Sequence, residues 1–201
     1  MAFPTWVYGV AIALAVMVLL WPEICRSAGR RSKAKIQESP RPDRSIFIDL
    51  DILRQIESGG NASAVSRAGA RGPYQFMRPA WQDAARSIAA RSAIPEPEFD
   101  YDKRVTDETI SRAMAWEYLT KCLPRYLTAT RLDATDVTGP VPDSLNARLA
   151  AWNAGALAVR RAYAKSPANW MAHLPFETRE FISRYHRERA ARAAAKQQSQ
   201  I

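Results

Sequence analysis

Cysteine, histidine and glycine are scarce in this chain of 201 residues, which holds two, two and eight of them. So few glycines exclude a collagen-like chain, and two cysteines are too few for a disulfide-stapled miniprotein. We expect no disulfide, because Cys25 follows an apolar run and Cys122 falls within a helical pattern. With His173 and His186 as the only histidines, the sequence offers no metal-ligand cluster, and we expect neither a metal nor a cofactor.

Alternating β-branched runs long enough to build a sheet are also absent, and apolar residues recur at helical spacing over most of residues 45–186. A chain of this length has room for one packed core with appendages. We therefore predict a mainly α fold, with one globular domain over residues 45–186.

The positive charge lies at the two ends of the chain. Residues 1–44 hold seven basic and three acidic residues, residues 184–201 hold five and one, and the residues between them hold 17 and 16. A protein that binds nucleic acid usually carries its positive charge as a patch on the folded domain. We therefore expect no nucleic-acid partner, whereas basic ends suit an anionic membrane surface, an anionic wall polymer or simple solubility.

An uncharged run over residues 2–22 begins the chain. As a helix, the 19 residues from 3 to 21 would reach about 28 Å, close to the thickness of a membrane's hydrocarbon layer. A cleaved secretory signal would need a basic residue before the run and small residues at the cut, and the sequence lacks both. We predict a single transmembrane anchor over residues 1–22, with a cleaved signal as the alternative, and a basic linker over residues 23–44.

Five basic residues between Arg26 and Lys35 directly follow the predicted anchor. The positive-inside rule would then leave the domain in the cytoplasm, but long domains can translocate regardless of flanking charge. The orientation of the chain stays open at this stage.

The first predicted helix covers residues 45–58 and carries an acidic side chain on its apolar stripe. Ile46, Leu50, Leu53 and Glu57 fall within about 40° of one another at 100° per residue. Glycines after residue 58 should end this helix. Further helices are predicted over residues 79–91, over 106–126, from 143 and from about 175, with loops at 95–102 and 139–142, a frayed end from 190 and a basic tail over 187–201.

Glu57 is the leading candidate for chemistry. A carboxyl group held against apolar neighbours loses hydration when it ionises, so its pKa rises and it can act as a general acid near neutral pH. The alternative is a glutamate at a helix end that reaches solvent. Glycosidases usually pair two carboxylates, about 5 Å or roughly 6.5–9.5 Å apart. No partner is obvious, since Asp49 and Asp51 lie on outer faces of the same helix and Asp83 has no predicted place.

Four short motifs resemble the ordered motifs of the soluble lytic transglycosylase family. They are ESGGN at residues 57–61, GARGPYQFM at 69–77, AWNAG at 151–155 and LPFETREF at 174–181. The resemblance covers about residues 45–186. It implies a lysozyme-like helical domain that cleaves peptidoglycan between N-acetylmuramic acid and N-acetylglucosamine.

The resemblance also implies roles for single residues. Glu57 matches the family's catalytic acid and base, which protonates the glycosidic oxygen while the sugar's acetamido group supports the reacting carbon. The carboxylate then takes a proton from the muramyl 6-hydroxyl, which closes a 1,6-anhydro ring. One group serving both steps needs a pKa of about 6–7. The candidate substrate-binding residues carried over from the motifs are Ser58, Tyr74, Gln75, Trp152, Asn153, Glu177 and Phe181.

Ser58 matches the serine that helps to orient the acid, and Asn153 is implied to contact substrate or Glu57. The sequence departs from the family where Tyr74 follows a proline and where Trp152 and Phe181 each replace a tyrosine. The loss at residue 181 removes a hydroxyl that lies near the acid in the family. We expect Tyr74 or Tyr185 to supply an equivalent hydroxyl.

These features predict a membrane-anchored lytic transglycosylase that faces the periplasm or cell wall, or sits in a virion membrane if phage-encoded. Its partners would be peptidoglycan strands, the membrane, and an envelope-spanning assembly or a virion. The alternatives are a lysozyme-type hydrolase of the same bond and a non-catalytic wall-binding scaffold on the same fold.

Overall fold

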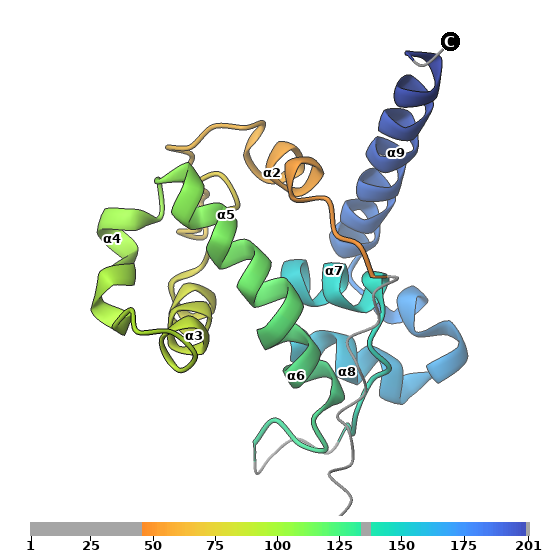
Figure 1. Cartoon of the computed structure of the whole chain (residues 1–201). Helices are drawn as coiled ribbons and strands as arrows, with labels where there is room; N and C mark the ends of the chain where they lie inside the picture. Colours follow the sequence, from red (N-terminus) through yellow and green to blue (C-terminus); the bar gives the residue numbers. More distant parts are fainter. Residues whose placement is uncertain (1–45, 134–137, 200–201) are drawn as a thin grey trace, which may run out of the picture. The chain divides into compact units, whose positions relative to one another are not determined.

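The computed structural model describes residues 46–133 and 138–199 of the chain (Figure 1). The predicted anchor or signal over residues 1–22 and the linker over 23–44 lie outside the described residues. Among the helices of the described ranges, none combines the length and hydrophobicity needed to cross a bilayer.

Helices dominate the described part, where extended backbone forms only isolated antiparallel bridges of Val65 and Phe76 with Arg71. This confirms the predicted mainly α fold. The described part contains the α-helices α2 (Leu50–Ser58), α3 (Arg78–Ala89), α4 (Tyr101–Arg104), α5 (Glu108–Glu117), α6 (Leu123–Thr128), α7 (Leu145–Ala154), α8 (Ala156–Lys165) and α9 (Phe176–Gln198), with 3₁₀ turns η1 (Glu96–Phe99) and η3 (Pro167–His173) and the π-helix η2 (Tyr118–Cys122).

Helix α2 begins later than predicted because Asp49 caps it. The Asp49 carboxylate accepts hydrogen bonds from the backbone N–H groups of Asp51 at 2.9 Å and Ile52 at 3.2 Å, and Asp49 itself is extended. The residues before it, Ile46 included, are therefore not helical. The helix ends at Gly59, whose φ of 62° gives the left-handed cap that the sequence predicted.

The long helix predicted over residues 106–126 is interrupted by the π-helix η2. Pro124 has no N–H to donate to the carbonyl of Thr120, and the N–H of Leu123 instead bonds to the carbonyl of Tyr118, five residues back. The extra residue in this turn changes which side chains of η2 face the helices around it. π-Helical turns often occur at functional sites, and Tyr118 lies in the main cavity described below.

Three other segments differ from the sequence prediction. Gly155, with φ 83°, divides the helix predicted from residue 143 into α7 and α8. The segment predicted as a loop over residues 95–102 contains η1 and the start of α4. Helix α9 continues to Gln198 instead of fraying from residue 190, and Figure 1 shows its C-terminal part extending beyond the other helices.

An aromatic cluster joins the turn before α3 to the rest of the core. The ring of Phe76 makes edge contacts with Trp81 of α3 at 5.3 Å and with Trp152 of α7 at 5.1 Å between centroids. Tyr118 of η2 lies 5.9 Å from the Trp152 ring. Because such edge contacts restrict ring orientation, the cluster fixes Trp152 at the end of α2.

Gly72 lies where the turn after α2 meets the end of α4. Its φ is +80°, and a Cβ added there would lie 2.1 Å from the carbonyl oxygen of Val105. A side chain at residue 72 would therefore collide with backbone, so this position requires glycine.

Replacing Gly72 with Ala should therefore destabilise the fold by at least about 3 kcal/mol, because backbone must move to relieve the clash. Gly69→Ala is the matched control: its φ is +85° and nothing lies within 4 Å of an added Cβ, so only the backbone penalty of about 1–2 kcal/mol remains. Urea unfolding measures both. Equal losses in the two variants would contradict the proposed contact.

Candidate functional site

The main candidate site is a cavity of about 560 Å³ beside the C-terminal end of α2. Its walls come from α2, the turn that follows it, α3, η2 and α7. The cavity brings together Glu57, Gln75, Trp152 and Asn153 of the sequence-predicted residues. The other lining residues are Ser66, Ala68, Ala70, Phe76, Met77, Pro79, Ala80, Asp83, Tyr118, Ala151 and Gly155.

Glu57 lies in the last turn of α2 and is half-buried in the cavity wall. Burial raises the pKa of its carboxyl group to about 7, against the opposing effects of a hydrogen bond from Trp152 and the charge of Arg184. Near neutral pH the group is thus present in both its protonated and its ionised form. The raised pKa that the sequence predicted for Glu57 is found.

Trp152 holds the carboxyl group of Glu57. Its indole N–H donates to Oε1 of Glu57 at 2.7 Å. The sequence analysis assigned Trp152 only to substrate binding, at a position where the family has a tyrosine. In the structure its indole provides a hydrogen-bond donor to the acid, so Trp152 is a positioning residue as well as part of the wall.

Asn153 is oriented by a residue that the sequence analysis did not single out. The buried hydroxyl group of Thr178, in α9, donates to Oδ1 of Asn153 at 2.7 Å. This bond leaves the amide N–H groups of Asn153, which have no hydrogen-bond partner among the described residues, as donors for a ligand. The motif at residues 174–181 thus reaches the site through Thr178. Glu177 is exposed and Phe181 is buried, and neither lines the cavity.

Gln75 stabilises the turn that forms one wall of the cavity. It has an unusual positive φ of 50°, and its side-chain N–H₂ donates to the carbonyls of Ala64 at 3.1 Å and Gly72 at 2.9 Å. Its side-chain oxygen remains as an acceptor. Gln75 can therefore accept a hydrogen bond from a ligand while its nitrogen holds the loop.

Ser58 and the two candidate tyrosines lie elsewhere. The Ser58 hydroxyl donates to the carbonyls of Arg54 and Pro73, which ties the end of α2 to the following turn. The Tyr74 hydroxyl lies 3.4 Å from Arg112, and that of Tyr185 accepts from the backbone N–H of Asp49 at 2.6 Å. Neither tyrosine lines the cavity, so the structure does not support the expectation that one of them replaces the missing hydroxyl.

Asp83 and Tyr118 are cavity residues that the sequence analysis did not place. Asp83 pairs with Arg86, and burial together with the nearby Asp83 raises the pKa of Tyr126. Burial and the nearby charge of Asp83 raise the pKa of Tyr118, which keeps its hydroxyl protonated. Asp83 follows Pro79, another cavity residue, by four positions, so both lie on the same face of α3. This spacing is the sequence signal that could have placed Asp83.

No group of three or more potential metal-ligating side chains occurs in the parts of the chain that the structure describes.

Comparison with known families gives a match. A family model described as the transglycosylase SLT domain matches residues 49–173, which is more than half of the chain and includes Glu57, Gln75 and Asn153. No curated protein and no solved structure gives a significant match.

Replacing Trp152 with Phe should raise the pKa of Glu57 above its value of about 7, because the hydrogen bond that favours the carboxylate is lost. A ¹³C NMR titration of the Glu57 carboxyl carbon measures this directly. Tyr118→Phe is the control, since it changes the same cavity but keeps the indole donor. An unchanged or lower pKa in Trp152→Phe would exclude the positioning role.

Glu57→Gln should make the protein more stable than the wild type above pH 7 and change little below pH 4.5. The folded state holds a proton on Glu57 between pH 4.5 and about 7 that the unfolded state releases, so wild-type stability falls as pH rises through this window. Above pH 7 the free energies of unfolding of the two proteins should differ by at most about 3 kcal/mol. Urea unfolding of both proteins at pH 4.5 and pH 8 tests this, and a difference that does not vary with pH would contradict it.

Proposed function

The chain belongs to the transglycosylase SLT domain family, and from this premise we propose that it is a peptidoglycan lytic transglycosylase with a lysozyme-like catalytic domain. It cleaves the β-1,4 bond between N-acetylmuramic acid and N-acetylglucosamine and forms 1,6-anhydromuramic acid. The observation that carries the proposal is Glu57, a carboxyl group with a pKa of about 7 in a cavity of about 560 Å³.

In the proposed reaction Glu57 acts first as an acid and then as a base. Oε1 accepts the bond from Trp152, so Oε2, which has no hydrogen-bond partner among the described residues, delivers the proton to the glycosidic oxygen. The C–O bond breaks while the muramyl acetamido group supports the cationic carbon. The Glu57 carboxylate then takes the proton of the 6-hydroxyl, whose oxygen closes the anhydro ring, and no water is consumed. A pKa near 7 lets one group perform both transfers.

The other cavity residues supply hydrogen bonds of defined direction. Trp152 stabilises the Glu57 carboxylate that forms after the first transfer. The amide N–H groups of Asn153, fixed by Thr178, are donors suited to a sugar's acetamido carbonyl. The oxygen of Gln75 and the carboxylate of Asp83 are acceptors for hydroxyl or amide N–H groups of the substrate.

Asp83 supports one alternative reaction, in which the protein hydrolyses the same bond. Its carboxylate would then act as the general base that activates a water molecule. Against this, Asp83 is held in an ion pair with Arg86. If the protein hydrolyses the bond through Asp83, Asp83→Asn abolishes turnover, whereas anhydro-product formation survives that change.

We propose that the enzyme is membrane-anchored and opens the wall locally, in phage entry or lysis or in building an envelope-spanning assembly. The uncharged run over residues 2–22 supports the anchor, and the family's polymeric substrate supports a domain that faces the periplasm or cell wall.

Digestion of purified sacculi by the full chain, followed by mass analysis of the released fragments, tests the reaction. Anhydromuramic ends are expected, and kcat/KM should fall about tenfold per pH unit above about 7 as Glu57 loses its proton.

Glu57→Gln should lower turnover at least about 10²–10⁴-fold. Glu188→Gln, an exposed change in α9, serves as the control. Reducing-end muramic acid would identify a hydrolase, and absence of any turnover would identify a scaffold.

A further inference from the structure

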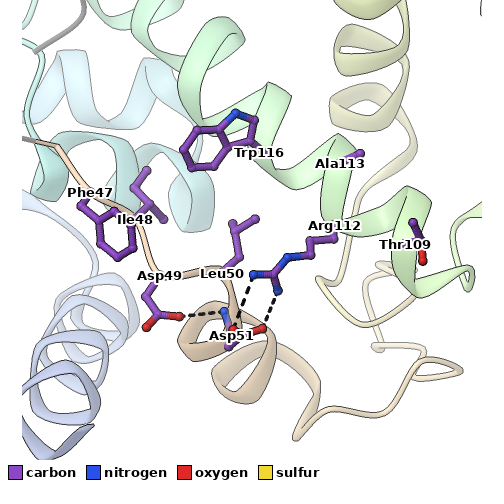
Figure 2. A pocket seen from close by; sticks show the side chains of 9 residues that line it. All are labelled: Phe47, Ile48, Asp49, Leu50, Asp51, Thr109, Arg112, Ala113 and Trp116. Carbon is purple, nitrogen blue, oxygen red and sulfur yellow. Dashed lines mark hydrogen bonds and ion pairs between the residues drawn. The ribbon is translucent and has the colours of Figure 1, made fainter. Parts of the chain in front are cut away.

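A second cavity, of about 480 Å³, lies between residues 47–51 and one face of α5, and we call it the α5 groove (Figure 2). The α5 residues that line it are Thr109, Arg112, Ala113 and Trp116, spaced as one helix face. The opposite wall exists because the Asp49 cap keeps the chain extended before α2 begins. This groove shares no lining residue with the cavity that contains Glu57.

Two exposed aromatic rings form the apolar part of the α5 groove. Phe47 is 59% exposed and Trp116 is 47% exposed, while Ile48 and Leu50 beneath them are 2% and 5% exposed. In Figure 2 the two rings lie toward one end of the groove and Arg112 and Asp51 toward the other. Large aromatic side chains left in water beside a hollow indicate a binding surface, because their burial against a ligand is favourable.

The polar part of the groove carries two acidic side chains, Asp49 and Asp51, and one basic side chain, Arg112. Asp51 and Arg112 form an ion pair, and the hydrogen bond from Arg112 lowers the pKa of Asp51, so both groups are ionised and offset each other. Asp49 is engaged by the N-terminus of α2 and lies 3.6 Å from Arg192. Among the described residues, the groove thus offers N–H donors, carboxylate acceptors and the Thr109 hydroxyl. The one basic side chain that lines it, Arg112, is paired with Asp51 and is not free to attract a phosphate.

A neutral ligand with hydroxyl groups along its edge and apolar C–H groups on its faces matches both parts of this groove. A pyranose ring has this chemistry, since its faces pack on aromatic rings and its hydroxyls bond to charged groups. We propose that the α5 groove is a second carbohydrate site, which holds peptidoglycan glycan away from the reacting bond. This inference rests on the proposed function for the identity of the sugar.

The position of the groove suits a polymeric substrate. Asp51 and Glu57 lie near opposite ends of α2, and the helix rises only about 9 Å between them. A glycan strand held in the groove therefore keeps neighbouring glycan close to the cavity, which raises its effective concentration there. The groove should aid attack on sacculi and be dispensable for a short soluble fragment.

The test compares full-length Trp116→Ala and Phe47→Ala with Ile94→Ala, a control residue that is 48% exposed and lines neither cavity. In a Glu57→Gln background, each groove change should weaken co-sedimentation with sacculi about tenfold. In the wild-type background, KM on sacculi should rise by a similar factor at unchanged kcat, and cleavage of a soluble tetrasaccharide fragment should not change. Trp116→Phe, which keeps a ring, should restore most of the binding.

A β-1,4-linked N-acetylglucosamine tetramer provides an independent probe. In an NMR titration it should shift the indole N–H signal of Trp116, and Trp116→Ala should leave the response of Trp152 intact. Shifts at Trp152 alone, or groove variants that bind sacculi as Ile94→Ala does, would overturn the proposal. So would concentration-dependent self-association that Trp116→Ala abolishes, because the groove would then be an interface between copies.

The two hypotheses fail in different ways. A chain that binds sacculi through Trp116 but never cleaves them retains the carbohydrate site and loses the proposed reaction. A chain that cleaves sacculi equally well with and without Trp116 and Phe47 retains the reaction and loses the site.

Discussion

The hydrogen bond from the indole of Trp152 to the carboxyl group of Glu57 is the interaction around which the site is built. Burial alone would favour the neutral acid still more, and the indole donor and the Arg184 charge offset part of this effect. The result is a pKa of about 7, at which neither protonation state costs much free energy. A group so balanced can both give and receive a proton, which an exposed glutamate with a pKa near 4.5 does poorly at neutral pH.

Several elements are needed to hold that one bond. Phe76 and Tyr118 pack edge-on against Trp152, and Tyr118 is placed there by a π-helical turn next to a proline. Gly72 lets the turn that carries Phe76 lie directly against Val105. These contacts pack the core, and they also fix the direction of the Trp152 indole N–H. They therefore influence the pKa of Glu57.

The sequence predicted the parts of the site that depend on local pattern. Helical spacing and a terminal glycine placed Glu57 at the end of a helix, and short motifs supplied Gln75 and Asn153. The donor role of Trp152 depends on ring orientation in a packed cluster, which no spacing encodes. Thr178 was missed because its effect passes through another side chain, and the shift at η2 that places Tyr118 depends on one absent N–H group.

Helix α9 contributes to the site although the matched family region stops at residue 173. Thr178 fixes the amide of Asn153, and the charge of Arg184 favours the Glu57 carboxylate. A fragment that ended at residue 173 would keep Glu57 and the glycines of the motifs. It would lose the hydrogen bond that orients Asn153, and the pKa of Glu57 would rise without the charge of Arg184. The part of the chain that builds the candidate site is therefore longer than the segment that the family model matches.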